Sequence, residues 1–330
     1  MSIVSGMRPT GKLHLGHYFG VLKNWLTFQE ERESFFLVAD WHALTTQYQH
    51  TESIQSDTLQ MTLDWLACGI DPEKSTLFIQ SQVKEHAELF LLLSMFTPMG
   101  WLLRNPTFKE QINEIKDKDI NHLGFFSYPV LQATDVLLYK GEQVPVGKDQ
   151  VPHVEIMREI ARRFNFITKT SVFPEPQEVL TPTSKLMGLD GRKMSKSYGN
   201  AILLSDTKET VEKKIRTMVT DPQRIKRLDP GDPEKCNLFP LHQTFSQPAT
   251  IQEVTAGCTS ASIGCVDCKK MLIPNINAFL EPILEKRHNL EKQPDLLQDI
   301  LSHGQRRAAA QAGATLNEVR QTLKLPTHDC

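Results

Sequence analysis

Short apolar segments alternate with helical patterns along the first two thirds of the chain, and this alternation limits the fold more than any other feature. The apolar segments are bounded by polar turns, as buried strands of a sheet are. Between them apolar residues recur at helical spacing, for example Leu15, Phe19, Leu22 and Leu26. The pattern predicts a parallel sheet whose strands are joined by crossover helices. The four predicted strands lie at residues 2–5, 35–39, 76–80 and 143–146.

The later part of the chain has helical patterns without strand-like segments. In the α/β region two further helices are predicted at residues 58–67 and 154–164, and frequent prolines predict a loop at residues 174–183. We therefore expect an α/β domain over residues 1–204 and a mainly α-helical domain over residues 205–330. The helices of the second domain are predicted at residues 211–219, 271–288, 296–304 and 306–323.

Composition excludes several classes of protein. The 330 residues carry a formal net charge of -2, and 40% of them are hydrophobic. A surface that is basic throughout is thereby excluded, so contacts with nucleic acid are expected to be local. No segment has the ~20 apolar residues that cross a bilayer, and the first residues lack the pattern of a secretion signal. We expect a cytoplasmic protein that does not bind a membrane.

Two short motifs, far apart in the sequence, indicate phosphate chemistry. In His14-Leu15-Gly16-His17 a glycine-bearing turn leads into a helix, so two imidazoles and unpaired helix amides can face one anion. The second motif, from Lys193 to Ser197, places two lysines between Gly191 and Gly199, on a segment able to close over a polyphosphate. Taken singly, the histidines could cap or pack a helix and the lysines could belong to a solvated surface. Together they supply the donors and cations that a phosphoryl transition state requires.

At these motifs the chain resembles the class I aminoacyl-tRNA synthetases. The hallmark sequences of that family are HIGH, which here is HLGH, and KMSKS, which is intact at residues 193–197. The similarity is greater still to the bacterial tryptophanyl-tRNA synthetases, and it is strong over about residues 2–220. Five further segments occur in that family's order: residues 5–11 (SGMRPTG), 40–43 (DWHA), 128–129 (YP), 135–139 (DVLLY) and 144–150 (VPVGKDQ).

The resemblance implies a Rossmann-like catalytic domain and a reaction in two steps. The carboxylate of L-tryptophan would attack the α-phosphate of ATP, bound with Mg²⁺, to give tryptophanyl-adenylate and pyrophosphate, and the acyl group would then pass to tRNA(Trp). His14 and His17 would stabilise the phosphorus, while Lys193 and Lys196 would hold the pyrophosphate. Many family members have asparagine at the position of His17, so we interpret this side chain as a hydrogen-bond donor. The implied ATP-binding residues are Arg8, Pro9, Thr10, Gly16, His17, Gly147, Lys148, Asp149, Leu186, Lys193, Met194, Ser195, Lys196 and Ser197, with Leu186 and Met194 near the adenine.

Selectivity for tryptophan is expected to depend on Asp135. The indole N–H can only donate a hydrogen bond, so a selective pocket should offer an acceptor such as an ionised carboxylate. Asp135 matches the aspartate that accepts the hydrogen bond of the indole N–H in the family. A bound phenylalanine would leave this carboxylate buried without a partner. Apart from the resemblance, Asp135 could be a helix cap or a surface carboxylate. Tyr128 and Gln150 resemble the residues that hold the substrate amino group, and Gln132 stands where relatives often have methionine at the indole face.

Four of the six cysteines lie close together, a distribution unlike that of a disulfide framework. Cys236, Cys258, Cys265 and Cys268 have the spacing C-x21-C-x6-C-x2-C. Four thiolates complete a zinc site or a [4Fe-4S] cluster. A single C-x-x-C pair favours the iron-sulfur cluster over Zn²⁺, and the spacing also resembles that of a subset of bacterial tryptophanyl enzymes. Four unrelated reduced thiols are the alternative, and the terminal Cys330 has no assigned partner.

The expected macromolecular partner is tRNA, and the family is homodimeric. Small basic clusters, each of which could equally be a solvated helix face, are concentrated in the helical domain at residues 213–214, 224–227, 269–270 and 306–307. The apolar stretch at residues 90–103 suits either a dimer interface or a buried helix. Three other functions stay open: a tyrosyl-tRNA synthetase, a nucleotidyltransferase for a small acceptor, and a synthetase relative that binds RNA without catalysis.

Overall fold

Five parallel strands form one sheet in the order β3-β2-β1-β4-β5. The computed structural model describes residues 2–106, 119–180 and 186–326; Cys330 lies outside them. The strand order and the helices around the sheet are those of a Rossmann-like fold, so the predicted α/β class is confirmed. The strands are β1 (Ser2–Met7), β2 (Glu33–Val38), β3 (Ser75–Ile79), β4 (Gln143–Val146) and β5 (Gln177–Leu180).

The first four strands coincide with the four predicted strands, but the fifth was missed. β5 lies within the proline-rich stretch that we predicted to be a loop, so that prediction is wrong for Gln177–Leu180. The prolines Pro174 and Pro176 precede the strand and none falls inside it. A strand at the edge of a sheet tolerates such flanking prolines because only one of its sides needs backbone partners. β5 pairs only with β4, with Val144 opposite Glu178.

Alternate residues of the strands enter two separate cores, one on each face of the sheet. Ile3 and Phe36 pack with the core that contains α2 and α4, whereas Val4 and Phe35 pack with the core of α5, α8 and α9. This alternation follows from the period of two along a strand. The helices around the sheet are α2 (Lys23–Glu31), α3 (Asp40–Gln47), α4 (Ile54–Ala67), α5 (Glu85–Phe96), α6 (Met99–Arg104), α8 (Leu123–Leu137) and α9 (Val151–Thr168), with short 3-10 turns at Gln80–Gln82 and Lys148–Gln150.

The predicted helix after the HLGH motif is present but changes its winding. It begins as α1 (Leu15–His17), continues as a π-helical turn (Tyr18–Leu22) and then becomes α2. Such turns are rare and occur most often at functional sites. Gly16 allows this start because a Cβ there would lie only 2.9 Å from the ring of His14.

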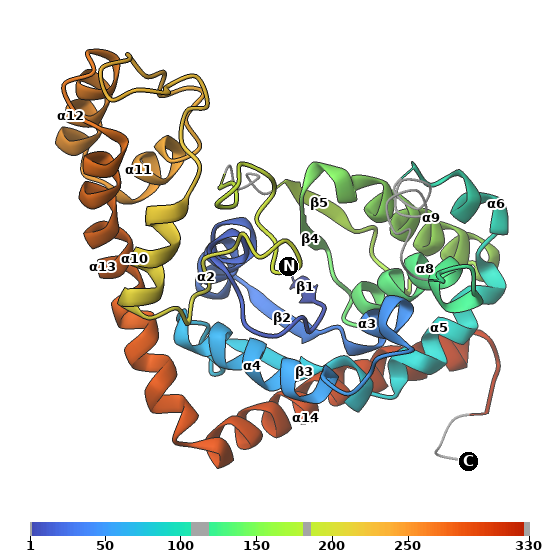
Figure 1. Cartoon of the computed structure of the whole chain (residues 1–330). Coiled ribbons are helices and arrows are strands. Elements are labelled where there is room, and N and C mark those ends of the chain that lie inside the picture. The colour runs from blue at the N-terminus through green and yellow to red at the C-terminus, as the bar shows by residue number, and fades with distance from the viewer. Residues whose placement is uncertain (1, 107–118, 181–185, 327–330) are drawn as a thin grey trace.

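An arm of four helices stands beside the sheet and its covering helices (Figure 1). It consists of α10 (Lys208–Thr217), α11 (Phe239–Phe245), α12 (Pro248–Thr259) and α13 (Cys265–Glu291). α13 is the longest of the four and packs against α10 at one level and against α4 of the sheet domain at another. It therefore connects the cysteine-bearing tip of the arm to the α/β part of the molecule.

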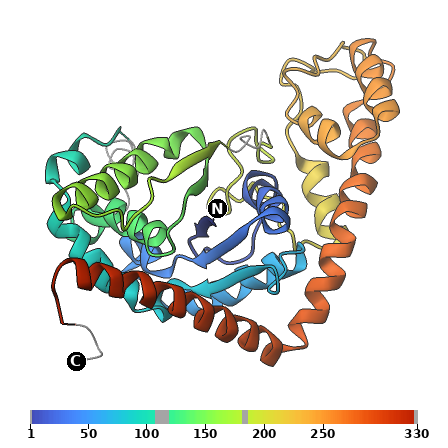
Figure 2. The ribbon, with the colours of Figure 1, turned by 180° about the vertical axis from the view of Figure 1, so that it is seen from behind.

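The last helix, α14 (Pro294–Thr322), leaves the arm and crosses the edge strand β3 (Figure 2). We predicted two helices here, divided near Gly304, and the structure shows one. Gly304 lies directly on the backbone of β3, where an added Cβ would be 1.8 Å from the carbonyl oxygen of Leu77. The glycine serves close helix-to-strand packing and not a break, so the prediction of a helix end is wrong.

The division of the chain near residue 205 stays a prediction. α10 to α13 follow that position and form the arm, whereas α14 follows it and packs on the sheet. In the described parts of the chain, none of the helices combines the length and the apolar character needed to cross a membrane.

Candidate active site

The nucleotide segments lie at the point where the strand order reverses. β1 is flanked by β2 on one side and by β4 on the other, and the two connections leave the sheet in opposite directions. A crevice forms at the carboxyl ends of such strands and is the usual ligand site of this fold. Residues 8–10 follow β1 and residues 147–149 follow β4, so both predicted nucleotide segments reach this crevice.

The HLGH motif is joined by backbone hydrogen bonds to the chain that follows KMSKS. The amide of Leu15 donates to the carbonyl of Ile202 at 3.0 Å, and the amide of Leu204 donates to the carbonyl of Leu13 at 2.9 Å. The ammonium of Lys196 donates to the carbonyls of Thr10 and Lys12. The two motifs, which are almost 180 residues apart in the sequence, therefore lie on one side of the sheet and face the same opening.

One cleft of about 1190 Å³ is lined by nearly all of the residues predicted to bind ATP and tryptophan. Pro9, which is buried, and Lys148, which is exposed, do not line it. The HLGH and KMSKS motifs line it from one side and α8 from the other. The predicted residues along its walls are Arg8, Thr10, His14, Gly16, His17, Tyr128, Gln132, Asp135, Gly147, Asp149, Gln150, Leu186, Lys193, Met194, Ser195, Lys196 and Ser197.

Both imidazoles of HLGH are neutral near pH 7. Burial, assisted by the charge of Lys196, lowers the pKa of His14 to about 4. Burial, with His14 and the two KMSKS lysines, lowers the pKa of His17 to about 3. The Nδ1 atom of His17 accepts the backbone N–H of His14 at 3.2 Å, so the proton of the neutral ring is on Nε2. His17 is therefore a hydrogen-bond donor through Nε2.

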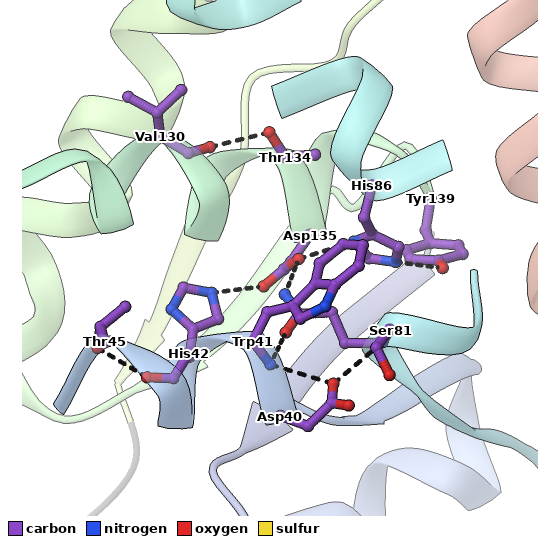
Figure 3. Close-up of polar contacts among 11 residues, drawn as sticks. Asp40, Trp41, His42, Thr45, Ser81, His86, Val130, Thr134, Asp135 and Tyr139 are labelled. Carbon is purple, nitrogen blue, oxygen red and sulfur yellow. Dashed lines mark hydrogen bonds and ion pairs between the residues drawn. The ribbon is translucent and has the colours of Figure 1, made fainter. Parts of the chain in front are cut away.

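Asp135 lies on α8 and lines the cleft, with 5% of its surface exposed. Its carboxylate accepts hydrogen bonds from three side chains (Figure 3): His42 at 2.9 Å on Oδ2, and Gln80 at 2.7 Å and His86 at 2.8 Å on Oδ1. Burial alone would raise the pKa of Asp135, but the contacts with His42 and His86 lower it to about 2. The carboxylate is thus a buried anion with about one acceptor position left for a further donor.

Two outer contacts fix the groups that surround Asp135. The amide oxygen of Gln80 accepts the backbone N–H of Trp41 at 3.1 Å, so its NH₂ group must face Asp135. The Nε2 atom of His86 lies 2.7 Å from the hydroxyl of Tyr139, and both side chains are fully buried (Figure 3). The ring of His86 is therefore held at both nitrogens, between the carboxylate of Asp135 and the hydroxyl of Tyr139.

Sequence reasoning assigned no role to His42, Gln80, His86 or Tyr139. His42 and Tyr139 fall in segments that carried the family resemblance, while Gln80 directly follows β3. A polar residue at the carboxyl end of a parallel strand was the available signal for Gln80. His86 had none, because it becomes part of the site only when α5 packs on α8.

The residues assigned to the substrate amino group also lie in the cleft. The hydroxyl of Tyr128 is 2.7 Å from Nε2 of His153, and burial raises the pKa of this tyrosine. The amide of Gln150 donates to Asp149 at 2.8 Å, and Gln132 is partly buried at the wall. Their roles stay predictions.

The four clustered cysteines lie in the arm, in the segment before α11, near the end of α12 and in the first turn of α13. Burial raises the pKa of Cys268 to about 12, and the charges of the other three thiols add to the effect, so all four share one neighbourhood. The sulfur of Cys268 is 3.3 Å from Nε2 of His242. Within the described residues, no three His, Cys, Asp or Glu side chains are placed to hold one metal ion. The arrangement therefore does not by itself form the predicted metal site.

Comparisons with known proteins identify relatives over nearly the whole chain. Residues 1–281 match the family described as tRNA synthetases class I (W and Y). The tryptophan–tRNA ligase of Thermotoga maritima is 51% identical, covering 98% of this chain and 99% of its own length, and that of Aquifex aeolicus is 45% identical, covering 99% and 100%. A crystal structure of tryptophanyl-tRNA synthetase from Campylobacter jejuni, complexed with ADP and tryptophan, matches with a TM-score of 0.89 at 35% identity, covering 98% and 100%.

These relatives favour the tryptophan enzyme over the three alternatives that the sequence left open. The tyrosyl enzyme shares the fold, but the proteins that are 40–51% identical to this chain over nearly its whole length are tryptophan–tRNA ligases. The chain belongs to the class I tRNA synthetases, within their tryptophanyl-tRNA synthetase branch, whose members are ATP-dependent tryptophan–tRNA ligases.

Proposed function

We propose that the cleft between α8 and the two motifs joins tryptophan to the AMP part of ATP with release of pyrophosphate, and then transfers the tryptophanyl group to tRNA(Trp) with release of AMP. The observation that carries the proposal is the buried carboxylate of Asp135, which is ionised, held by three donors and open to one more in the cleft that HLGH and KMSKS also line. An indole N–H directed at Asp135 leaves the substrate carboxylate free to reach the nucleotide. The cleft therefore offers sites for both reacting groups.

Phosphoryl transfer is assigned to the neutral histidines and the two lysines. His17 would donate through Nε2 to the charge that develops at the α-phosphate, beside His14. Lys196 donates to neutral backbone carbonyls, and a polyphosphate would be a stronger partner because its hydrogen bonds are charge-assisted. Lys193 is exposed at the mouth of the cleft and would meet the pyrophosphate. Mg²⁺ would enter with ATP and neutralise phosphate charge.

The remaining nucleotide contacts are assigned by position. Leu186 and Met194 are buried and would pack against the adenine. Arg8 and Thr10 after β1, and Gly147 and Asp149 after β4, would line the ribose and phosphates at the switch point. Ser195 and Ser197, whose hydroxyls are 2.9 Å apart, would contribute donors from the KMSKS segment.

Aminoacylation of total tRNA tests this function. The purified chain is incubated with ATP, Mg²⁺ and one labelled amino acid at a time. Tryptophan alone should be transferred, and only to tRNA(Trp). Charging with tyrosine would favour the tyrosyl alternative, whereas adenylate formation without any charging would favour a nucleotidyltransferase. Absence of both reactions would leave RNA binding without catalysis.

The arm is the proposed site of the tRNA anticodon. Two of the predicted basic residues are held internally: Lys214 binds Asp206 at 2.6 Å, and Lys269 donates to the carbonyl of Met218 at 2.6 Å. Their neighbours Lys213 and Lys270 are exposed and are the better candidates for phosphate contacts. The pair at residues 306–307 belongs to α14, away from the arm.

A [4Fe-4S] cluster on Cys236, Cys258, Cys265 and Cys268 is the second part of the proposal, with Zn²⁺ as the alternative. The support is the set of soft thiol donors in one neighbourhood of the arm. Binding would require the thiols to approach one another and lose their protons. The role would be structural, fixing the tip of the arm. Iron, sulfide and zinc analysis of anaerobically purified protein, with its visible absorbance, decides between the cluster, zinc and free thiols.

We also propose that the chain acts as a homodimer in the cytoplasm, where its tRNA and ATP are found. α5 and α6, within the predicted stretch at residues 90–103, expose a row of large apolar side chains to solvent. Exposure of several such residues together is typical of an interface. The row comprises Leu91 (55% exposed), Met95 (74%), Met99 (66%) and Leu103 (52%). Sedimentation equilibrium of wild type and of Met95→Glu measures the association directly.

A further inference from the structure

A buried ion pair connects the arm to the sheet domain. Arg287, near the end of α13, is 2% exposed, and Asp64, on α4, is fully buried. The guanidinium donates to Oδ1 of Asp64 and to both the backbone and side-chain oxygens of Gln60. Its Nε also lies 3.2 Å from Glu291. Each of the three guanidinium nitrogens therefore has a partner, and two of them hold α13 on α4.

The second oxygen of Asp64 reaches the catalytic motif. Oδ2 accepts the backbone N–H of Leu13 at 2.6 Å, and Leu13 directly precedes His14. The carbonyl of Leu13 accepts the amide of Leu204, which follows the KMSKS segment. Asp64 thus holds the peptide from which both the HLGH turn and the chain after KMSKS are positioned.

Stability alone is a weak reason for this arrangement. Removing two charges from water costs free energy that their attraction seldom exceeds, and apolar pairs of similar size are often as stable. An apolar pair could not, however, accept the N–H of Leu13, which is buried. The ion pair does something that an apolar pair would not: it fixes an acceptor at one position, beside the first residue of the motif.

We propose that Asp64 and Arg287 are positioning residues of the ATP site. Arg287 fixes the orientation of the Asp64 carboxylate, and Asp64 fixes the peptide of Leu13 and with it the ring of His14. The arm and the two motifs are therefore linked through one carboxylate. This inference rests on the proposed role of His14 at the phosphates of ATP.

The double variant Asp64→Leu/Arg287→Met tests the proposal, because it removes the acceptor without leaving a buried charge unpaired. Tryptophan-dependent pyrophosphate exchange is measured for each variant at the same number of degrees below its own melting temperature. We expect kcat/KM for ATP to fall at least about tenfold through misplacement of His14, while KM for tryptophan changes less than about twofold because Asp135 lies outside this chain of contacts. Hydrogen exchange of residues 11–18 should become faster.

Two matched variants separate positioning from stability. Asp64→Asn/Arg287→Met keeps an acceptor for Leu13 and removes the guanidinium that the amide NH₂ group would otherwise face, so it should retain most of kcat/KM for ATP. Arg320→Met breaks an ion pair with Glu88 that joins α14 to α5, 2.6 Å in length and without contact to either motif. It should lower the melting temperature and leave kcat/KM for ATP unchanged. The inference is overturned if Asp64→Leu/Arg287→Met equals wild type, or if Arg320→Met lowers kcat/KM for ATP equally. Wild type without tryptophan-dependent exchange would instead overturn the proposed function.

Discussion

His42 and His86 bind different oxygens of the same carboxylate: Nε2 of His42 lies 2.9 Å from Oδ2 of Asp135, and Nδ1 of His86 lies 2.8 Å from Oδ1. One histidine comes from α3 and the other from α5, so two helices fix the carboxylate from two directions. A carboxylate held in this way cannot turn to accommodate a misplaced substrate. The selectivity of the pocket therefore depends on geometry as well as on charge.

Replacing Asp135 by alanine should impair the use of tryptophan far more than the binding of ATP. The indole N–H would lose its acceptor, and His42 and His86 would lose theirs. We expect kcat/KM for tryptophan in pyrophosphate exchange to fall at least about 100-fold, with KM for ATP changed less than about threefold. Unchanged tryptophan selectivity in Asp135→Ala would refute the assignment.

Tyr139→Phe should produce a smaller effect of the same kind. The substitution removes only the hydroxyl that shares a hydrogen bond with Nε2 of His86, in a fully buried position. Loss of one buried hydrogen bond corresponds to about 1 kcal/mol, so kcat/KM for tryptophan should fall about fivefold. KM for ATP should stay as in wild type. A suitable control is Tyr48→Phe, an exposed tyrosine on the surface, for which steady-state exchange should show no change.

Acid should destabilise the fold through its buried neutral histidines. The pKa of His14 lies at about 4 and that of His17 at about 3, below the ordinary 6.5. Between the ordinary pKa and the lowered ones, the two histidines are protonated in the unfolded chain but neutral in the folded chain. The free energy of unfolding therefore falls as the pH drops below 6.5. The slope reaches about 1.4 kcal/mol per pH unit for each proton. Asp135, with a pKa of about 2, stays ionised over this range.

Urea denaturation at a series of pH values measures this slope. The variant His14→Gln/His17→Gln should show a flatter dependence below pH 6.5, because two of the protons are no longer taken up. His153, whose pKa burial also lowers to about 4, accounts for part of what remains. The exposed His50 offers a matched substitution, His50→Gln, that should keep the wild-type slope. Equal slopes in the double variant and wild type would contradict the prediction.

Two glycines of α14 should respond to alanine with opposite sign. In Gly304→Ala the new methyl group meets the carbonyl of Leu77, so the helix must move off β3. We expect a loss of about 1–3 kcal/mol in the free energy of unfolding. Gly313 is in the same helix with nothing within 4 Å of an added Cβ, so Gly313→Ala should gain about 0.5–1 kcal/mol. Equal effects of both substitutions would show that the contact with Leu77 is not tight.

The sequence predicted those parts of the fold that depend on local pattern. β1 to β4 follow from apolar runs, and α10 and α13 of the arm follow from their periodicity, whereas α11 and α12 were not predicted. β5 was missed because four residues beside Pro174 and Pro176 carry too little pattern, and its pairing with β4 supplies what they lack. The continuity of α14 was missed because Gly304 is explained by a tertiary contact and not by the end of a helix. Packing against Leu77 is invisible in the helix's own sequence.

The candidate site shows the same division. His14, His17 and the KMSKS lysines were found because their chemistry is carried by contiguous motifs, and all of them line the cleft. His86 and Arg287 were not found, since each acts only through a partner more than 40 residues away in the sequence. Side chains that position others leave no local pattern.

The position of α14 over β3 has a consequence for how the molecule is made. β3 is at one edge of the sheet, and an uncovered edge offers backbone groups to any other strand. α14 comes after every strand in the chain, so all five strands have emerged from the ribosome before this edge is covered. A nascent or truncated chain without α14 presents an open β3 and should depend on chaperones to avoid joining other chains.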